Sequence, residues 1–158
     1  MNGGSVVDLI LWRHAEAEDG PDDHARRLTP KGFKQAERMG AWLDEHLPKN
    51  ARVIVSPAVR AQQTAKHLAR AQTTSEAIAP GAQAAAVLEA CGWPHARGTI
   101  VVVGHQPALG SAAALALTGK AGRWALKKGA IWWLSAREGE SAARVVAVLS
   151  PDLITRDS

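Results

Sequence analysis

Four basic residues could do chemistry together, because each follows a short apolar run with the composition of a buried strand. Arg13 and His14 directly follow the first run, Arg60 comes soon after the second, and His105 comes after the third. Two imidazoles and two guanidiniums, with no acidic cluster beside them in the sequence, suit a phosphoryl group better than a metal ion or a sugar. We therefore expect phosphate chemistry wherever the fold gathers these side chains.

The runs that precede these residues must form strands that end at one place. The runs cover residues 6–12, 51–55 and 99–103. They are rich in β-branched residues and apolar with little alternation, which is typical of strands covered on both faces. Between the first two, Thr29 followed by Pro30 predicts a helix start, and Pro48 ends that helix. Apolar and small residues from Phe33 to Leu47 recur at helical spacing, which predicts that Phe33 lies on the buried side. Alternating strands and helices predict a parallel α/β fold, whose ligands bind beyond the carboxyl ends of the strands.

The last third of the chain predicts a hairpin at the edge of the sheet. Two strand-like runs, 129–135 and 144–149, are joined by a glycine-containing turn at 137–140. An antiparallel edge is common on a mostly parallel sheet. Within the first run, Trp132 and Trp133 should face opposite sides by simple alternation.

Length and composition favour one domain, residues 1–158. The chain has 158 residues, 46% of them hydrophobic, which is enough for a single core. Its apolar stretches are shorter than the roughly 20 residues that span a bilayer, and the start of the sequence lacks a secretory pattern. We therefore expect no membrane association and a cytoplasmic location. Cys91, the one cysteine, has no internal disulfide partner and is interpreted as a packing residue.

The basic balance of the chain does not indicate a nucleic-acid partner. The formal net charge is +4, yet lysines and arginines are spread along the chain and mixed with acids. Nucleic-acid binding would favour a basic stripe with interleaved aromatic residues. We interpret the charge as an aid to attracting anionic substrates. The remaining histidines are expected on the surface; they are His24, His46, His67 and His95.

Each of the four candidate residues has a role that its chemistry suggests. His14 is the better nucleophile, and Arg13 beside it can hold a phosphate in line for attack. Arg60 should lie in the first turns of a helix, where backbone N–H groups also favour an anion. His105 can donate to phosphoryl oxygens as charge builds in the transition state. A metal site from the two histidines would need further ligands that the sequence does not place nearby, so no metal or other cofactor is expected.

Four segments of the sequence together resemble the histidine phosphatase superfamily. They are residues 13–17, 26–32, 56–65 and 103–107. The short chain and the sequence Ala15-Glu16-Ala17 are most similar to the small bacterial phosphohistidine phosphatases of the SixA type. The resemblance implies a phosphoglycerate mutase-like three-layer sandwich, with a mostly parallel central sheet, an antiparallel edge and helices on both faces.

The resemblance also implies residue roles and a mechanism. By their positions in the motifs, His14 matches the histidine that becomes phosphorylated, Arg13 and Arg60 match the phosphate-binding arginines, and His105 matches the second pocket histidine. Arg26 matches an arginine that precedes Leu-Thr in small members, as a further phosphate-binding candidate. The implied reaction is metal-independent: His14 takes the phosphoryl group, and water then releases it as phosphate.

Two departures from the superfamily pattern bear on the substrate. Ala15 stands where many members have glycine. The carboxylic acid that larger members use to protonate the leaving group has no clear match. The candidates are Glu16, Glu18, Asp19 and Glu89, of which Glu16 and Glu89 are retained. Without a dedicated acid, a labile P–N bond is a better substrate than the P–O bond of an alkyl phosphate.

Three functions remain open from the sequence. The preferred one is a phosphohistidine phosphatase acting on a phosphorylated protein, either a phosphotransfer domain or a phosphocarrier. A phosphomonoesterase for a small metabolite is the second, and a module that binds phosphate or phosphohistidine without turnover is the third. A mutase is disfavoured because a second phosphate would need additional basic residues.

Overall fold

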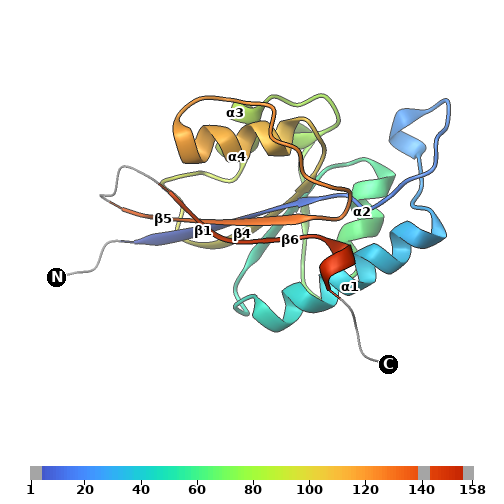
Figure 1. Ribbon diagram of the computed structural model, residues 1–158, viewed down its shortest axis with the longest axis horizontal. Coiled ribbons are helices and arrows are strands. Elements are labelled where there is room, and N and C mark those ends of the chain that lie inside the picture. The colour runs from blue at the N-terminus through green and yellow to red at the C-terminus, as the bar shows by residue number, and fades with distance from the viewer. Residues whose placement is uncertain (1–4, 139–142, 155–158) are drawn as a thin grey trace.

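A mixed β-sheet lies at the centre of the computed structural model, which describes residues 5–138 and 143–154 (Figure 1). The strands are β1 (Val6–Arg13), β2 (Arg52–Val55), β3 (Thr73–Thr74), β4 (Gly98–Gly104), β5 (Ile131–Arg137) and β6 (Arg144–Leu149). They form a six-stranded sheet in the order β3-β2-β4-β1-β5-β6. The first strand of the chain therefore lies inside the sheet.

The strand directions confirm the predicted fold class. β1 is parallel to β4, and β2 is parallel to both β4 and β3. β5 runs antiparallel to β1 and to β6, which makes the predicted hairpin the edge of the sheet. Part of the predicted turn, residues 139 and 140, lies outside the described residues. Strand β3 is only two residues long and was not predicted.

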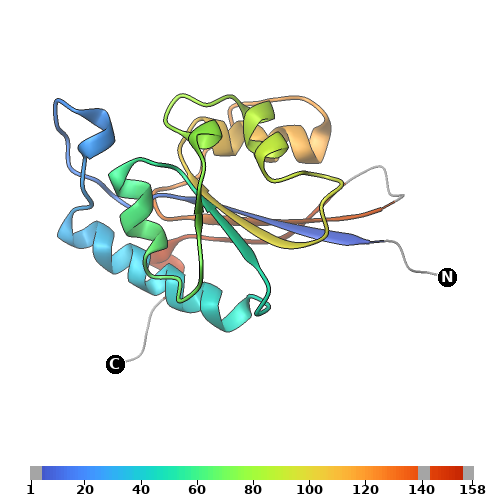
Figure 2. The same ribbon diagram turned by 180° about the vertical axis from the view of Figure 1, so that it is seen from behind.

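Helices cover both faces of the sheet. The α-helices are α1 (Pro30–His46), α2 (Val59–Ala65), α3 (Ala84–Ala90) and α4 (Ala108–Thr118), and short 3-10 turns lie at η1 (Asp23–Ala25), η2 (Glu76–Ile78) and η3 (Pro151–Leu153). Helices α1 and α2 lie on one side and α3 and α4 on the other (Figures 1 and 2). None of the helices in the described part of the chain is long and apolar enough to cross a membrane.

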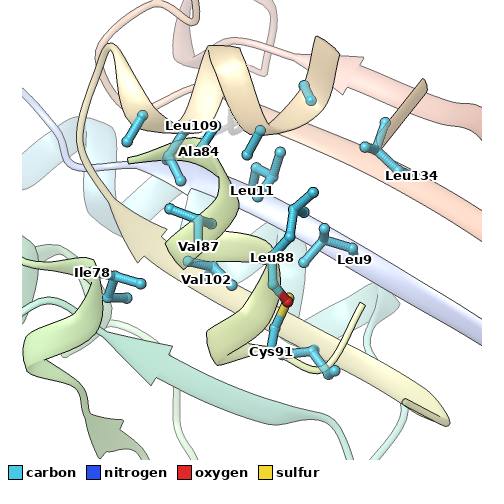
Figure 3. Packing of buried hydrophobic residues seen from close by; sticks show 14 of the residues in the cluster. Leu9, Leu11, Ile78, Ala84, Val87, Leu88, Cys91, Val102, Leu109 and Leu134 are labelled. Atoms are coloured by element: carbon cyan, nitrogen blue, oxygen red, sulfur yellow. The ribbon is translucent and has the colours of Figure 1, made fainter. Parts of the chain in front are cut away.

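Alternation along the strands builds a separate core on each face. In β1, Leu9 and Leu11 belong to the core under α3 and α4 (Figure 3), whereas Ile10 and Trp12 belong to the core under α1 and α2. The same alternation places Trp132 against the first core and Trp133 against the second, as predicted. Both faces of β1 are thus buried, which explains its nearly continuous apolar sequence.

Helix α1 begins where the sequence predicts. Thr29 caps it, since its Oγ1 accepts the N–H of Gly32 at 2.9 Å, and Pro30 occupies the first turn. Phe33, expected on the buried side, is instead 37% exposed, and Met39 is fully buried on that helix. The helix ends at His46, ahead of Pro48, so the chain can turn into β2.

Candidate active site

A pocket of about 330 Å³ lies at the carboxyl ends of β1 and β4 and the start of α2. Its walls include all four residues singled out by their chemistry: Arg13, His14, Arg60 and His105. The other lining residues are Ala17, Asp23, Arg26, Pro80, Gly81, Gln106 and Lys128. Segments far apart in the sequence therefore place two imidazoles and several cations around one space.

His14 is held by the backbone on both sides. Its N–H donates to Gly104 O at 3.0 Å, and its carbonyl accepts from the N–H of Gly129 at 3.1 Å. Gly129 has a φ of 77°, a conformation that favours glycine. The next residue, Ala15, donates its N–H to Thr64 Oγ1 at 3.0 Å, which ties this segment to α2. The imidazole, in a residue only 7% exposed, is therefore fixed in direction.

Hydrogen bonds define the tautomer of His14. Nδ1 lies 2.7 Å from Ala15 O, and a carbonyl can only accept, so Nδ1 carries the proton. Nε2 is then unprotonated in the neutral ring, in agreement with the N–H that Arg60 Nε donates to it at 3.3 Å. The lone pair of His14 is therefore on Nε2, where it accepts the hydrogen bond from Arg60.

The pocket keeps His14 uncharged at neutral pH. Burial lowers its pKa to about 4; the bond to Ala15 opposes this shift, and the positive charges of Arg60 and Arg13 add to it. An unprotonated imidazole is the form that can attack phosphorus.

Arg60 lies in the first turn of α2, and three of its nitrogens have partners. Besides the bond to His14, Nη1 donates to Asp23 O at 2.6 Å and Nη2 lies 3.1 Å from Asp23 Oδ2. Its own carbonyl accepts from Thr64 Oγ1 at 2.7 Å. The guanidinium is thus oriented by a histidine on one side and by the Asp23 segment on the other.

Arg13 and His105 complete the pocket, and each has an unpaired nitrogen. Arg13 Nη1 donates to Leu126 O at 2.8 Å, and His105 Nε2 lies 2.7 Å from Ser56 Oγ. Arg13 Nε and His105 Nδ1 are buried with no partner within the described residues. Burial is the main cause that lowers the pKa of His105 to about 3, and repulsion by Arg60, and by His14 once it is protonated, adds to it. His105 is therefore also neutral at neutral pH.

This arrangement agrees with comparisons to known proteins. The sequence profile of the histidine phosphatase superfamily (branch 1) matches residues 9–83. The chain belongs to this superfamily.

The chain is also similar in sequence to curated proteins. Over 115 residues the chain is 32% identical to an uncharacterized protein of Mycobacterium leprae. This match covers 68% of the chain and 71% of that protein. Over 64 residues it is 44% identical to a phosphohistidine phosphatase SixA homolog of Haemophilus influenzae. That second match covers 37% of this chain and only 39% of the relative.

Solved structures of the superfamily share the fold over nearly the whole chain. A protein assigned as phosphohistidine phosphatase SixA from Nakamurella multipartitia superimposes with a TM-score of 0.77 at 25% identity, covering 95% of this chain and 99% of that one. The protein histidine phosphatase SixA complexed with tungstate gives 0.74 at 21% identity, covering 92% and 98%. This second likeness is evidence for the fold alone.

The general-acid candidates suggested by comparison with the superfamily do not line the pocket. Glu16 Oε2 instead accepts a hydrogen bond from Thr29 Oγ1 at 2.8 Å, at the start of α1. Glu89 is exposed on α3, on the opposite side of the sheet from α1 and α2. Thr29 therefore binds the carboxylate of Glu16, and the sheet separates Glu89 from α2 and Arg60.

The carboxylate that does reach the pocket, Asp23, was missed by sequence reasoning. It lies between two arginines, with Oδ1 3.1 Å from Arg26 Nη1 and Oδ2 3.1 Å from Arg60 Nη2. The hydrogen bond from Arg26 is the largest effect on the pKa of Asp23 and lowers it; burial opposes this shift, and the hydrogen bond from Arg60 adds to the lowering. The only signal in the sequence was a polar loop at 20–24, which indicates a turn but no direction.

The structure also places the remaining basic and metal-ligating candidates. Arg26 lines the pocket, and its guanidinium contacts Asp23 and the carbonyl of Glu18. Of the other histidines, His67 is half-buried against Gly40, and the rest are exposed. Within residues 5–138 and 143–154, no group of three or more His, Cys, Asp or Glu could hold a metal ion.

Proposed function

We propose that this protein is a phosphohistidine phosphatase that removes the phosphoryl group from a phosphorylated protein, with His14 as a covalent carrier. The observation that carries the proposal is the bare Nε2 of His14, oriented by Ala15 and lying beside Arg60 in a cationic pocket. A phosphatase is the activity that the superfamily match and the pocket chemistry support together.

The reaction has two steps that balance. The Nε2 lone pair of His14 forms a bond to phosphorus while the P–N bond of the substrate breaks. The electron pair of that bond returns to the substrate imidazole, which leaves as a neutral ring because its other nitrogen already carries a proton. Water then attacks the phosphorus of phospho-His14, phosphate leaves, and the lone pair returns to Nε2. Because Arg60 Nε–H donates to that lone pair, Arg60 must exchange this hydrogen bond for one to a phosphoryl oxygen.

The neighbouring groups suit a phosphoryl group in the transition state. Arg13 and Arg60 supply guanidinium donors from two sides, and the two unpaired nitrogens, Arg13 Nε and His105 Nδ1, can gain an oxygen acceptor. Arg26 and Lys128 add positive charge to the walls. Fixed donors aimed at the developing charge are the main catalytic effect expected here.

The charge of Asp23 supports a phosphoramidate substrate. As an ionised carboxylate held by two arginines, Asp23 is a poor proton donor for an alkoxide leaving group. A protonated imidazole leaves phosphorus without such help. The partner expected from this chemistry is a phosphohistidine-bearing protein, a phosphotransfer domain or a phosphocarrier, and relatives named SixA support the same class.

A substrate panel tests the proposal. Wild type, His14→Ala and the control His95→Ala, an exposed histidine outside this pocket, are assayed with a phosphohistidine peptide, an aryl phosphate and an alkyl phosphate. We expect fastest turnover of the peptide, loss of at least about 10³-fold in His14→Ala, and trapping of phosphoryl label on His14. Equal or faster turnover of the alkyl phosphate would indicate a metabolite phosphatase, and binding without hydrolysis would indicate a binding module.

A further inference from the structure

Ser56 contacts His105 from the side opposite the unpaired ring nitrogen. Its Oγ lies 2.7 Å from His105 Nε2, and both residues are buried, at 0% and 5% exposure. Ser56 follows β2 and donates its own N–H to Val103 O at 3.0 Å, so its position is fixed by the sheet. The Ser56 hydroxyl therefore has a fixed position beside the His105 ring.

The available donor and acceptor sites of Ser56 and His105 decide which group donates in this contact. A serine hydroxyl has one donor and two acceptor sites, and Ser56 Oγ already accepts the N–H of Ala58 at 3.2 Å. If Ser56 donates to His105 Nε2, the hydroxyl and Nε2 are both satisfied, and only a protonated Nδ1 stays unpaired. If Nε2–H donates instead, two buried groups stay unpaired within the described residues: the Ser56 O–H and the Nδ1 lone pair.

The first arrangement has the lower cost, since each buried unpaired polar group costs about 1–3 kcal/mol. It also leaves the better group unpaired. A phosphoryl oxygen can accept from Nδ1–H, whereas it would be repelled by a bare Nδ1 lone pair. Arg13 Nε, the other unpaired donor among the pocket residues, has the same requirement for an acceptor.

We propose that Ser56 is a positioning residue, which donates to Nε2 of His105 and thereby keeps the proton on Nδ1 for a phosphoryl oxygen. Its catalytic consequence rests on the proposed function, but the proton position does not. Ser56 acts through His105 and does not itself touch the reacting atoms.

The proton position can be measured in the wild-type protein without any turnover. In ¹⁵N-histidine-labelled protein, protonated and bare ring nitrogens resonate in separate ranges, and His105 is assigned by comparison with His105→Gln. We expect a protonated Nδ1 and a bare, hydrogen-bonded Nε2. A protonated Nε2 would overturn the proposal, whatever the activity of the protein.

Variants of the hydroxyl test its effect on the reaction. Ser56→Ala should lower kcat for the phosphohistidine peptide by about 10- to 100-fold with little change in KM, and should mix the His105 tautomers. Ser56→Thr, which keeps the hydroxyl, should retain Nδ1–H and recover most of kcat. As a control, Ser111→Ala removes a hydroxyl that is hydrogen-bonded to Gly122 O outside the pocket, and it should leave kcat and the His105 tautomer unchanged.

The outcomes separate this inference from the proposed function. If wild type fails to hydrolyse phosphohistidine, the proposed function fails. The role of Ser56 is then still decided by two measurements: the His105 tautomer in wild type and the tungstate affinity of Ser56→Ala. Tungstate binding weakened in Ser56→Ala and retained in Ser56→Thr supports the proposal. A wild-type tautomer and wild-type tungstate affinity in Ser56→Ala would refute it.

Discussion

His14 must stay uncharged inside a cationic pocket, and burial provides that state. A histidine in water is partly protonated near pH 6.5, and a protonated ring could not attack phosphorus. In the folded protein the pKa of His14 falls to about 4 and that of His105 to about 3. The nucleophile is thus ready at neutral pH without a neighbouring base.

The same shift predicts how stability depends on pH. Between about pH 6.5 and pH 4 the unfolded chain binds protons at His14 that the native state does not, so the free energy of unfolding must fall as pH falls. For His14 alone we expect a loss of about 2 kcal/mol between pH 7 and pH 4.5. Above pH 6.5 this effect is absent.

Urea unfolding at pH 7, 5.5 and 4.5 measures this effect. His14→Asn should show a shallower fall than wild type, with the remainder due to His105. Asp23 also has a lowered pKa, but its effect on stability begins only near and below its ordinary value of 3.8. Equal slopes in wild type and His14→Asn would contradict the prediction.

Some residues of the pocket could be predicted from the sequence, and others could not. Arg13, His14 and His105 lie at the carboxyl ends of strands, so the carboxyl-end rule alone placed them near one another. Asp23 has no such marker, because a loop carboxylate finds its partner only when the loop closes over Arg60. The same holds for Ser56, whose bond to His105 joins the ends of two neighbouring strands.

At the scale of elements, the Asp23 segment binds the guanidinium of Arg60. The carbonyl and carboxylate of Asp23 hold two of the guanidinium nitrogens. A phosphoryl group must share or replace the carboxylate contact, and it is also repelled by that charge.

Asp23→Asn should therefore bind tungstate more tightly, by about 3- to 10-fold at low salt, since the repulsion is removed while the backbone carbonyl remains. Calorimetric titration measures the affinity. The matched control is Asp19→Asn, an exposed acid in the same loop that does not line the pocket. Weaker binding in Asp23→Asn would mean that the carboxylate mainly orients Arg60.

The start of α1 is pressed against the segment that carries the site. A Cβ on Gly32 would lie 2.0 Å from Glu16 O, and Glu16 follows His14 by two residues. Gly32→Ala should therefore displace one of the two segments, lowering the free energy of unfolding by about 1–3 kcal/mol and reducing turnover.

Thermal or urea unfolding and the peptide assay measure the two effects. Gly20→Ala is the control, because the nearest atom to its Cβ, Arg26 Cγ, lies at an ordinary contact distance of 3.8 Å. Wild-type stability in Gly32→Ala would show that the contact relaxes without cost.

Elements with a clear pattern were predictable, and those defined by neighbours were not. The strands, the capped helix α1 and the terminal hairpin follow from composition, capping and turn residues. β3, at two residues, is too short for any periodicity and exists only through its pairing with β2. Phe33 shows the same limit, since helical spacing does not say how wide the buried face is.

For the whole molecule, the net charge of +4 should act on the encounter with an anionic phosphoprotein. We expect kcat/KM for such a substrate to fall as salt rises from about 0.01 M to 0.15 M, where the screening length shortens from about 30 Å to about 8 Å. Lys128→Ala, at the pocket, should flatten this dependence more than Lys120→Ala, which is exposed outside it. If both substitutions change the salt dependence of kcat/KM equally, that dependence comes from the total charge of the protein and not from the charge at the pocket.

The interior position of β1 has a consequence for how the protein is made. Leu9 pairs with Ile100 on one side and with Leu134 on the other, so neither neighbour exists until most of the chain has been translated. During synthesis this apolar segment emerges before either of its partner strands and stays unpaired, a state that favours aggregation. Ribosome-bound fragments ending before residue 98 should therefore be protease-sensitive and bind chaperones, whereas fragments that have released β5 should be protected.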